Sequence, residues 1–313
     1  MKTLDRSMML RLSCVLAASL TFPSITLAQQ ASRPQPILAW SAHPVQAAPW
    51  TAPNKPHWKL SEVLAKHSGQ RSWQEDIVSD RDFIARYISM APGEKTKRQF
   101  FADDRVFWIV QSGRMRVSID GQEPFVATKG FLVQVPYRVA YSIETEGPEA
   151  SLRFEVIGAQ AVPLYPVDET PAPIEGKKYL KVSYTGHGAY DEINKPYLDF
   201  NKDVVSANGR GGPFVKDDKT FANIIRGSGQ PPPPPSNLGH FHIGYSEFWL
   251  VLEGKIDYLI EGVPFFTTEP GDVVYAPQGR WHRASFGGTG SATRLAINPR
   301  PDGMHNFQPP SEN

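Results

Sequence analysis

The chain has 313 residues, which is long enough for two domains of ordinary size or for one large β domain. Its 33 Lys and Arg residues nearly balance 32 Asp and Glu residues, and the formal net charge is +1. This balance argues against nucleic acid or an anionic membrane surface as a partner. The densest basic stretch, GEKTKR at residues 93–98, is interpreted as a solvated loop.

The first 28 residues have the pattern of a cleavable signal peptide. Lys2, Arg6 and Arg11 precede an apolar run that ends in a small-x-small sequence at Ala28. The run is too short to span a bilayer, and a buried N-terminal helix is the alternative interpretation. Cleavage after Ala28 would also remove Cys14, the only cysteine of the chain. We therefore expect a periplasmic or secreted protein that has no disulfides, no thiolate metal site and no membrane association once the signal is cut.

Residues 29–69 are predicted to form an N-terminal lead-in with one short helix. Residues 29–58 are rich in Pro, Ala and Gln, whereas KLSEVLAKHSG at 59–69 has a helical pattern, with Ser61 as its cap and Gly69 as its stop. Beyond this point, short β-branched and aromatic runs alternate with Gly, Pro, Asp and Asn. That pattern indicates an all-β sandwich or barrel.

Two parts of the chain are related by a shift of 141 residues. FWIVQSGRMRVSIDG at 107–121 aligns without a gap with FWLVLEGKIDYLIEG at 248–262. The same shift superposes three glycines, one proline and one arginine: Gly113 on Gly254, Gly121 on Gly262, Gly130 on Gly271, Pro136 on Pro277, and Arg153 on Arg294. The repeat predicts one β module present twice. We assign the modules to residues 70–160 and 220–313, with residues 161–219 as linker and inter-module segment.

The second copy contains a group of residues with the spacing of metal ligands. The sequence His240-x-His242-x4-Glu247-x6-Gly254 is followed by Gly271-x5-Pro277-x-Gly279-x2-His282. These are similar to the two sequence motifs of the cupin superfamily. The resemblance covers roughly residues 220–300, and the first copy resembles a cupin only in its glycines and proline. It implies an all-β bicupin: two double-stranded β-helix (jelly-roll, cupin) barrels in one chain.

Strand geometry also brings the four polar residues together. Residues two apart on a strand face the same side, so His240 and His242 would point into one cavity. A hairpin about residues 253–254 would place Glu247 beside them, and His282 would arrive from a later strand. The same hairpin would put Glu247, Trp249 and Val251 on one face with Ile256, Tyr258 and Ile260.

Three imidazoles and one carboxylate suit a single divalent transition metal ion, with Fe or Mn favoured and Zn, Ni or Cu as alternatives. In a six-coordinate ion, about two positions would remain open for water or substrate. At the equivalent positions the first module has Gln99, Phe101, Val106 and Tyr141. Because none of these is a good ligand for a divalent ion, we predict one metal per chain, in the C-terminal module, with the N-terminal module as a scaffold.

Other residues near the motif are candidates for contact with a substrate. Trp249 and Tyr258 would line the barrel interior as pocket or core residues. Arg294 could neutralise a substrate carboxylate, but its repeat partner Arg153 lies in a module without ligands, which favours a structural salt bridge for both. Residues that flank the ligands could support them from a second layer: Tyr245, Tyr275, Arg280 and Trp281.

Some features have no clear assignment from the sequence. The run Pro231 to Pro235 would form an extended entry loop over the pocket mouth or a rigid spacer. Five histidines have no partner at an informative spacing: His43, His57, His67, His187 and His305.

The resemblance implies a metal-dependent enzyme that acts on a small chelating organic substrate, as a dioxygenase, decarboxylase, isomerase or lyase. Oxalate-degrading bicupins normally have ligands in both modules and an arginine before the His-x-His pair, where this chain has SNLG at 236–239. We therefore do not assign that activity. The alternatives are a non-catalytic periplasmic binding protein for metal or small molecules, and a cupin with vestigial ligands. Either a monomer or a homodimer is compatible with two modules in one chain.

Overall fold

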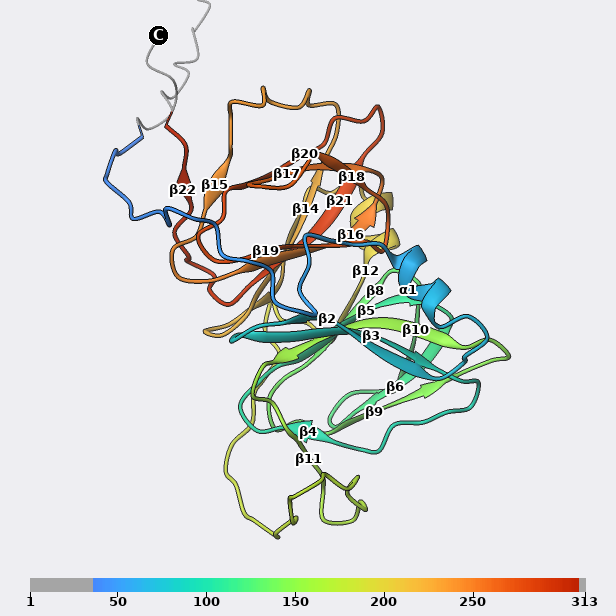
Figure 1. The fold of residues 1–313 in the computed structure, drawn as a ribbon. Helices are drawn as coiled ribbons and strands as arrows, with labels where there is room; N and C mark the ends of the chain where they lie inside the picture. Colours follow the sequence, from blue (N-terminus) through green and yellow to red (C-terminus); the bar gives the residue numbers. More distant parts are fainter. Residues whose placement is uncertain (1–35, 310–313) are drawn as a thin grey trace, which may run out of the picture. The chain divides into compact units, whose positions relative to one another are not determined.

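A computed structural model describes residues 36–309 of the chain, so the predicted signal peptide lies outside the described residues. Residues 36–39 fall in a separate compact unit, and both repeat copies lie within the unit that begins at Trp40. The described part is mostly β structure (Figure 1). None of its helices is long and apolar enough to cross a membrane.

The first copy of the repeat forms two facing sheets. A six-stranded sheet has the order β12-β8-β5-β10-β3-β2, and a three-stranded sheet has the order β7-β6-β9. The short strands β4 and β11 pair with each other. The bounds are β2 (Trp73–Ser79), β3 (Phe83–Met90), β4 (Phe100–Phe101), β5 (Val106–Ser112), β6 (Arg114–Ile119), β7 (Phe125–Thr128), β8 (Phe131–Val135), β9 (Tyr141–Thr145), β10 (Ser151–Gly158), β11 (Pro163–Leu164) and β12 (Tyr197–Asp199).

The second copy has the same arrangement. Its six-stranded sheet has the order β1-β19-β16-β21-β14-β13, and a five-stranded sheet has the order β18-β17-β20-β15-β22. The bounds are β1 (His57–Trp58), β13 (Gly211–Lys216), β14 (Phe221–Gly227), β15 (His240–Phe241), β16 (Glu247–Glu253), β17 (Ile256–Ile260), β18 (Phe266–Thr268), β19 (Val273–Ala276), β20 (His282–Ser285), β21 (Ala292–Asn298) and β22 (Asn306–Phe307). Two helical segments complete the described elements: α1 (Leu60–Lys66) and the π-helix η1 (Phe200–Ser206).

The 141-residue shift relates the hydrogen-bonding registers of the two modules as well as their sequences. Trp108 pairs with Glu155 in the first module, and the shifted pair in the second is Trp249 with Ala296. An irregularity in the strand pairing recurs at the shifted position. In the first module Arg153 pairs with Val110 and Leu152 with Ser112, so that one residue of β5 is skipped. In the second module Arg294 pairs with Val251 and Thr293 with Glu253, so that the equivalent residue of β16 is skipped. The modules therefore share their pairing in detail, and the repeat prediction is confirmed.

Each large sheet has an outermost strand taken from outside its module. Strand β1, in the N-terminal lead-in, pairs with β19 of the C-terminal module, and β12, in the inter-module segment, pairs with β8 of the N-terminal module. Residues 57–58 and 197–199 are thus parts of sheets and not only connections. Strand β13, which precedes residue 220, also belongs to the C-terminal sheet.

The buried side chains form three clusters. One fills the N-terminal barrel around Trp108, another fills the C-terminal barrel around Trp249, and the largest joins the two six-stranded sheets. At this junction the Phe83 and Phe248 rings lie 5.9 Å apart, and the buried Tyr87 hydroxyl donates a hydrogen bond to the Gly271 carbonyl. The two modules therefore bury their large sheets against one another, as two single-module subunits would in a dimer.

The cap predicted for the short helix is wrong. Helix α1 begins at Leu60, its N-cap position is Lys59, and no side chain of the capping residue is hydrogen-bonded. Instead, Asp272 of the C-terminal module accepts a hydrogen bond from the Leu60 backbone N–H at 3.1 Å. Because this cap comes from a residue more than 200 positions away, a local sequence pattern could not reveal it.

The hairpin predicted about residues 253–254 is also wrong. Strand β16 pairs with β19 and β21, whereas β17 pairs with β18 and β20, so the chain crosses from one sheet to the other at Gly254. Gly254 has a φ of +67°, which a side chain would strain. The predicted shared face still exists, because residues of both strands meet in one barrel core across the two sheets: Trp249, Val251, Ile256, Tyr258 and Ile260.

Candidate metal centre

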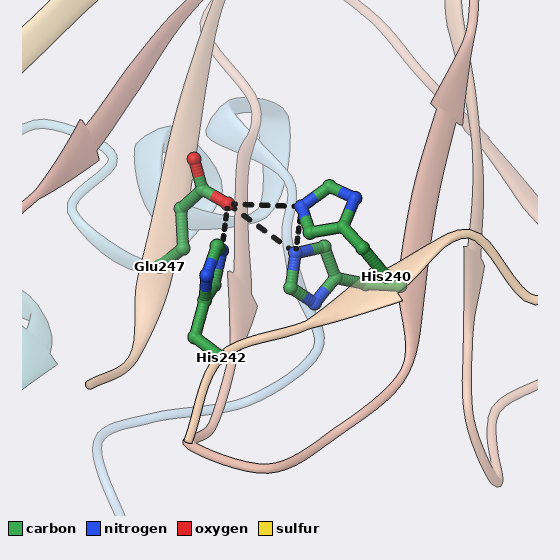
Figure 2. Close-up of side chains that lie close together, drawn as sticks. His240, His242 and Glu247 are labelled. Atoms are coloured by element: carbon green, nitrogen blue, oxygen red, sulfur yellow. Dashed lines mark hydrogen bonds and ion pairs between the residues drawn. The ribbon is translucent and has the colours of Figure 1, made fainter. Parts of the chain in front are cut away.

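The four predicted ligands converge at one end of the C-terminal barrel. His240 lies in β15, His242 follows that strand directly, Glu247 begins β16 and His282 begins β20. His240 and His282 are paired across β15 and β20, which sets their rings side by side. Figure 2 shows His240, His242 and Glu247 pointing toward one another, with the Glu247 carboxylate facing the imidazoles.

The ligand atoms are close enough for one ion. The Glu247 Oε2 atom lies 3.0 Å from His242 Nε2, 3.3 Å from His282 Nε2 and 3.9 Å from His240 Nε2. The Nε2 atoms of His240 and His282 are 3.1 Å apart. All four ligand atoms lie within 4.8 Å of one another, and three of the four residues are buried. One cation could therefore be reached by all four.

Backbone carbonyls fix which nitrogen of two imidazoles faces the centre. His242 Nδ1 lies 3.2 Å from the Met304 carbonyl oxygen, and His282 Nδ1 lies 2.9 Å from that of Arg280. A neutral imidazole that donates from Nδ1 carries its lone pair on Nε2. The lone pairs of His242 and His282 then face the carboxylate of Glu247, an arrangement of acceptors that fits a cation between them.

The electrostatics of the cluster also favour the metal-binding protonation states. Burial lowers the pKa of His240 to about 4, and burial likewise lowers the pKa of His282. Burial alone would raise the pKa of Glu247, but its contacts with the three histidines hold that pKa well below its ordinary value. At neutral pH His240 and His282 are thus neutral and Glu247 is anionic, which are the forms that bind metal.

Two of the four predicted flanking residues touch the ligands. The Tyr245 ring stacks on His242 with centroids 4.3 Å apart, and Arg280 supplies the carbonyl that orients His282. Tyr275 instead donates a hydrogen bond to Ser246 at 2.9 Å and has no described contact with the ligands. The fourth predicted residue, Trp281, packs edge-on against Phe241 with centroids 4.7 Å apart.

The three predicted pocket residues extend inward from the ligands. Trp249 lies next to the cluster, with its ring centroid 5.1 Å from that of His282. Tyr258 lies behind it, 5.5 Å from the Trp249 ring, and both are fully buried. Arg294 places its Cζ atom 5.4 Å from the Trp249 ring centroid. The interior of the barrel thus continues from the ligands through Trp249 to Tyr258 and Arg294.

The salt-bridge expectation holds for one arginine of the pair and fails for the other. Arg153 Nε is 2.9 Å from Glu155 Oε2 inside the N-terminal barrel, and both side chains are buried. Arg294 forms no ion pair with any residue in the described part of the chain. The physical reason is the partner: the position equivalent to Glu155 is Ala296, which has no carboxylate.

A fifth histidine, His305, also lies at the metal centre, although no sequence pattern connects it with the four ligands. The His305 ring is 4.7 Å from that of His242 and 4.8 Å from that of His240, and the residue is exposed to solvent. The tail carrying it returns as β22 beside β15, which seats Met304 and His305 next to the ligands. No motif spacing includes His305, because only the path of the tail determines its position.

The loop Pro231 to Pro235 is not seen to cover the opening of the barrel next to the metal ligands. A cavity of about 250 Å³ lies beside Tyr245 and is lined also by Ile243, Arg300 and Met304. The prolines are instead held by Arg283, on the outward-facing side of β20, which donates hydrogen bonds to the carbonyls of residues 233 and 234. No described contact joins the prolines to the four ligands, so the loop is anchored along the barrel wall.

The N-terminal module has no metal cluster among its described residues. Gln99 and Tyr141 form a bridge that matches the pairing of His240 with His282, and Gln99 Nε2 donates to Tyr141 Oη at 3.3 Å. Phe101 and Val106 are 5% and 1% exposed and pack in the barrel core. Apolar packing therefore occupies the place of the ligands, as predicted.

Comparisons with known proteins agree with this architecture. Residues 231–298 match the family profile of the cupin domain. A cupin 2 conserved barrel domain protein from Leptotrichia buccalis has a TM-score of 0.51 and 15% identity, over 78% of this chain and 96% of that one. Salicylate 1,2-dioxygenase from Pseudaminobacter salicylatoxidans has a TM-score of 0.58 and 12% identity, over 83% of this chain and 86% of that one.

A mutant of Bacillus subtilis oxalate decarboxylase has a TM-score of 0.48 and 11% identity, over 84% of this chain and 81% of that one. A search of curated protein sequences found no match. At such low identities the similarities establish the fold and not the activity. The chain has a cupin fold. The fold resembles that of two-module cupins, and the described residues hold a three-histidine, one-glutamate cluster in the C-terminal module alone.

Proposed function

We propose that the C-terminal module is a mononuclear metal centre that acts on a small organic substrate able to chelate the ion. The observation that carries this proposal is the convergence of four ligand atoms within 4.8 Å, with two imidazoles oriented by backbone carbonyls. His240, His242, Glu247 and His282 would hold one divalent transition metal, with Fe or Mn favoured over Zn, Ni or Cu. A metal bound by these residues would supply Lewis-acid chemistry for a carboxylate, enolate or phenolate and, if it is Fe or Mn, chemistry with O₂.

The remaining residues of the site position the ligands and restrict water. The Met304 and Arg280 carbonyls hold His242 and His282, and Tyr245 stacks on His242 from the side of the adjacent cavity. Trp249 fills the barrel directly behind His282 and excludes solvent from that side. The reaction types that fit are dioxygenase, decarboxylase, isomerase and lyase chemistry on a small molecule.

The test is metal analysis of the purified full-length protein, followed by O₂ uptake and product analysis with catechols, diketones and hydroxy acids. We expect close to one tightly bound metal and turnover of at least one compound class, with turnover lost in Glu247→Gln. Tyr141→Phe, at the equivalent of His282 in the N-terminal module, is the matched control and should leave turnover unchanged. Stoichiometric binding without turnover across the panel would contradict the enzyme and support a non-catalytic binding protein.

We also propose that the protein is exported and works in the periplasm or outside the cell, as a monomer or homodimer. The basic residues and the small-x-small sequence ending at Ala28 support export. Intact-mass measurement of the soluble protein from a Gram-negative host should give a chain that begins at or near Gln29. Retention of Met1 on the functional protein would contradict this, and light scattering would give the oligomeric state.

A further inference from the structure

Four buried polar atoms inside the C-terminal barrel have no hydrogen-bond partner among the described residues. They come from four different strands, β14, β16, β17 and β21, and they surround the small side chain of Ala296. Three belong to hydrogen-bond donors and one is an acceptor: Trp249 Nε1, Tyr258 Oη, Arg294 Nε and Asn223 Oδ1. Buried polar atoms in folded proteins are rarely left unpaired, so such a group indicates a missing partner.

The four residues lie close to one another. Ala296 pairs with Asn223 on one side and with Trp249 on the other, and Arg294 lies two residues along the same face of β21. The Trp249 ring is 5.4 Å from Arg294 Cζ and 5.5 Å from the Tyr258 ring. Burial raises the pKa of Tyr258 to about 12, and Arg294 opposes that rise both through its charge and because its side chain comes close to hydrogen-bonding reach of the Tyr258 hydroxyl. One small group could therefore meet several of these atoms.

The N-terminal module shows which group fits at this place. There, the equivalent of Ala296 is Glu155, which is paired with Trp108 on the neighbouring strand and accepts a hydrogen bond from Arg153 Nε at 2.9 Å. Trp108 Nε1 has no partner among the described residues in that module either, so the arginine carries the comparison. In the C-terminal module the arginine and the tryptophan are retained as Arg294 and Trp249, but the carboxylate is replaced by a methyl group. Arg294 is partly exposed, but its Nε atom is buried and has no partner among the described residues. A carboxylate is the best-matched partner of a guanidinium.

Several other interior positions of the C-terminal barrel differ in size from their N-terminal equivalents. Three more interior positions carry alanine where the N-terminal module has a larger side chain: Ala276 for Val135, Ala284 for Ile143, and Ala292 for Ser151. The change is not uniform, since Tyr258 replaces Val117. That larger side chain, however, adds a hydroxyl donor close to Arg294.

We propose that this region binds the carboxylate of an organic acid, with Arg294 as its counter-ion. Tyr258 Oη and Trp249 Nε1 supply further donors, and Asn223 Oδ1 accepts from a hydroxyl group of the acid or from water. The Trp249 ring connects this region with the metal centre, because its centroid lies 5.4 Å from Arg294 Cζ and 5.1 Å from the ring of His282. That this acid is the substrate rests on the proposed function, whereas its binding does not.

The first test is calorimetric titration of the metal-loaded full-length protein with acetate, glycolate and benzoate, and with the corresponding neutral amides. We expect at least one carboxylate to bind tenfold or more tightly than its amide, and Arg294→Gln to weaken that binding at least tenfold. The same titration of His242→Ala separates carboxylates held by Arg294 from those held by the metal. Equal binding of acids and amides, or unchanged binding in Arg294→Gln, would overturn the proposal.

A second pair of variants keeps the proposal testable if Arg294→Gln folds poorly. Ala296→Glu restores the carboxylate of the N-terminal module, and Ala296→Gln adds the same bulk without charge. We expect both to abolish carboxylate binding but only Ala296→Glu to raise the melting temperature, because it supplies the ion pair. A Glu variant no more stable than the Gln variant would contradict a free Arg294 at this place.

The two proposals fail in different ways. Arg294-dependent carboxylate binding by a protein that turns over no substrate would support this site and contradict the proposed enzyme. Turnover that Arg294→Gln leaves unchanged would support the enzyme and contradict an acid substrate held by Arg294.

Discussion

The two modules share one backbone register and differ in what fills it. Phe101 and Val106 pack in the N-terminal barrel where His242 and Glu247 face each other in the C-terminal one. Strand pairing and turn glycines coincide under the same 141-residue shift. The frame of a small β barrel is set by its turns and strand pairing, and its interior can then hold either apolar packing or ligands.

The comparison also shows that losing ligands and losing an internal ion pair are separate events. The N-terminal module has no metal cluster among its described residues but keeps the Arg153–Glu155 pair, while the C-terminal module has the reverse combination. Each module thus carries one kind of polar interior. The variants below are ways to break or to sharpen this contrast.

The largest effect is expected at the ligands themselves. His242→Ala or Glu247→Ala should reduce bound metal from about one per chain to nearly none, because the remaining ligands cannot enclose the ion. The circular dichroism spectrum should stay unchanged, since the barrel is stabilised by its apolar faces. Elemental analysis gives the metal content. Two tightly held metals per chain, or a metal content unaffected by His240→Ala, would contradict a single C-terminal centre.

At the position equivalent to His242, the opposite outcome is expected. Phe101→Ala should lower the free energy of unfolding by about 3 kcal/mol, because it removes a buried aromatic ring and leaves a cavity. The metal content should not change. Chemical denaturation followed by tryptophan fluorescence measures the first, and elemental analysis the second. A loss of metal in Phe101→Ala would mean that the modules are not independent in their interiors.

The ion pair of the N-terminal module gives the third contrast. Glu155→Ala makes this barrel resemble its partner and leaves Arg153 buried without a counter-ion, which should cost roughly 3 kcal/mol of unfolding free energy. Thermal or chemical denaturation of the wild type and of the double variant Arg153→Met/Glu155→Leu supplies the comparison. We expect the apolar pair to recover most of the loss; equal loss in both variants would contradict a cost due to the unpaired charge.

The smallest effect is expected from moderate acid. The pKa of His240 is lowered by burial to about 4 and that of His282 is lowered as well, so both stay neutral at pH 6. Bound metal after dialysis should therefore be the same at pH 8 and pH 6 and should fall only below about pH 5. Half-release near the ordinary histidine pKa of about 6.5 would contradict the burial effect.

The same shifts set the sign of a stability change in the metal-free protein. Because the unfolded histidines bind protons at a higher pH than the folded ones, the unfolded state is favoured as the pH falls from about 6.5 toward 4. Denaturation of chelator-treated protein at several pH values measures this. His240→Ala should remove part of the slope.

The repeat and the ligand set could be predicted because both consist of particular residues at fixed intervals along the sequence. Glycines at turns that need a positive φ recur at fixed intervals, and the four ligands stand at set spacings from two of them, Gly254 and Gly271. The pairing of Gln99 with Tyr141 shows that the ungapped shift also holds in space. Such features depend on local geometry, which a sequence pattern records directly.

The features that could not be predicted all depend on contacts between residues that are far apart in the sequence. The sequence around Leu60 does not indicate that Asp272 caps helix α1. The sequence around His305 likewise does not indicate that this residue lies next to His240. The false hairpin at Gly254 has the same origin. Its turn residues are those of a hairpin, but the strands on either side pair with others far along the chain.

Because the outermost strand of each large sheet comes from outside its module, the order of the strands along the chain affects how the protein can fold. His57, next to the start of the described chain, bonds to Asp272 across 215 residues at 2.8 Å. Strand β1 therefore completes its pairing only with a strand that lies beyond the whole N-terminal module in the sequence. A fragment beginning at residue 220 would lack both β1 and β13 and would leave two open sheet edges, which invite aggregation. The large sheet of the C-terminal barrel is thus completed by a strand that precedes the entire N-terminal module in the sequence.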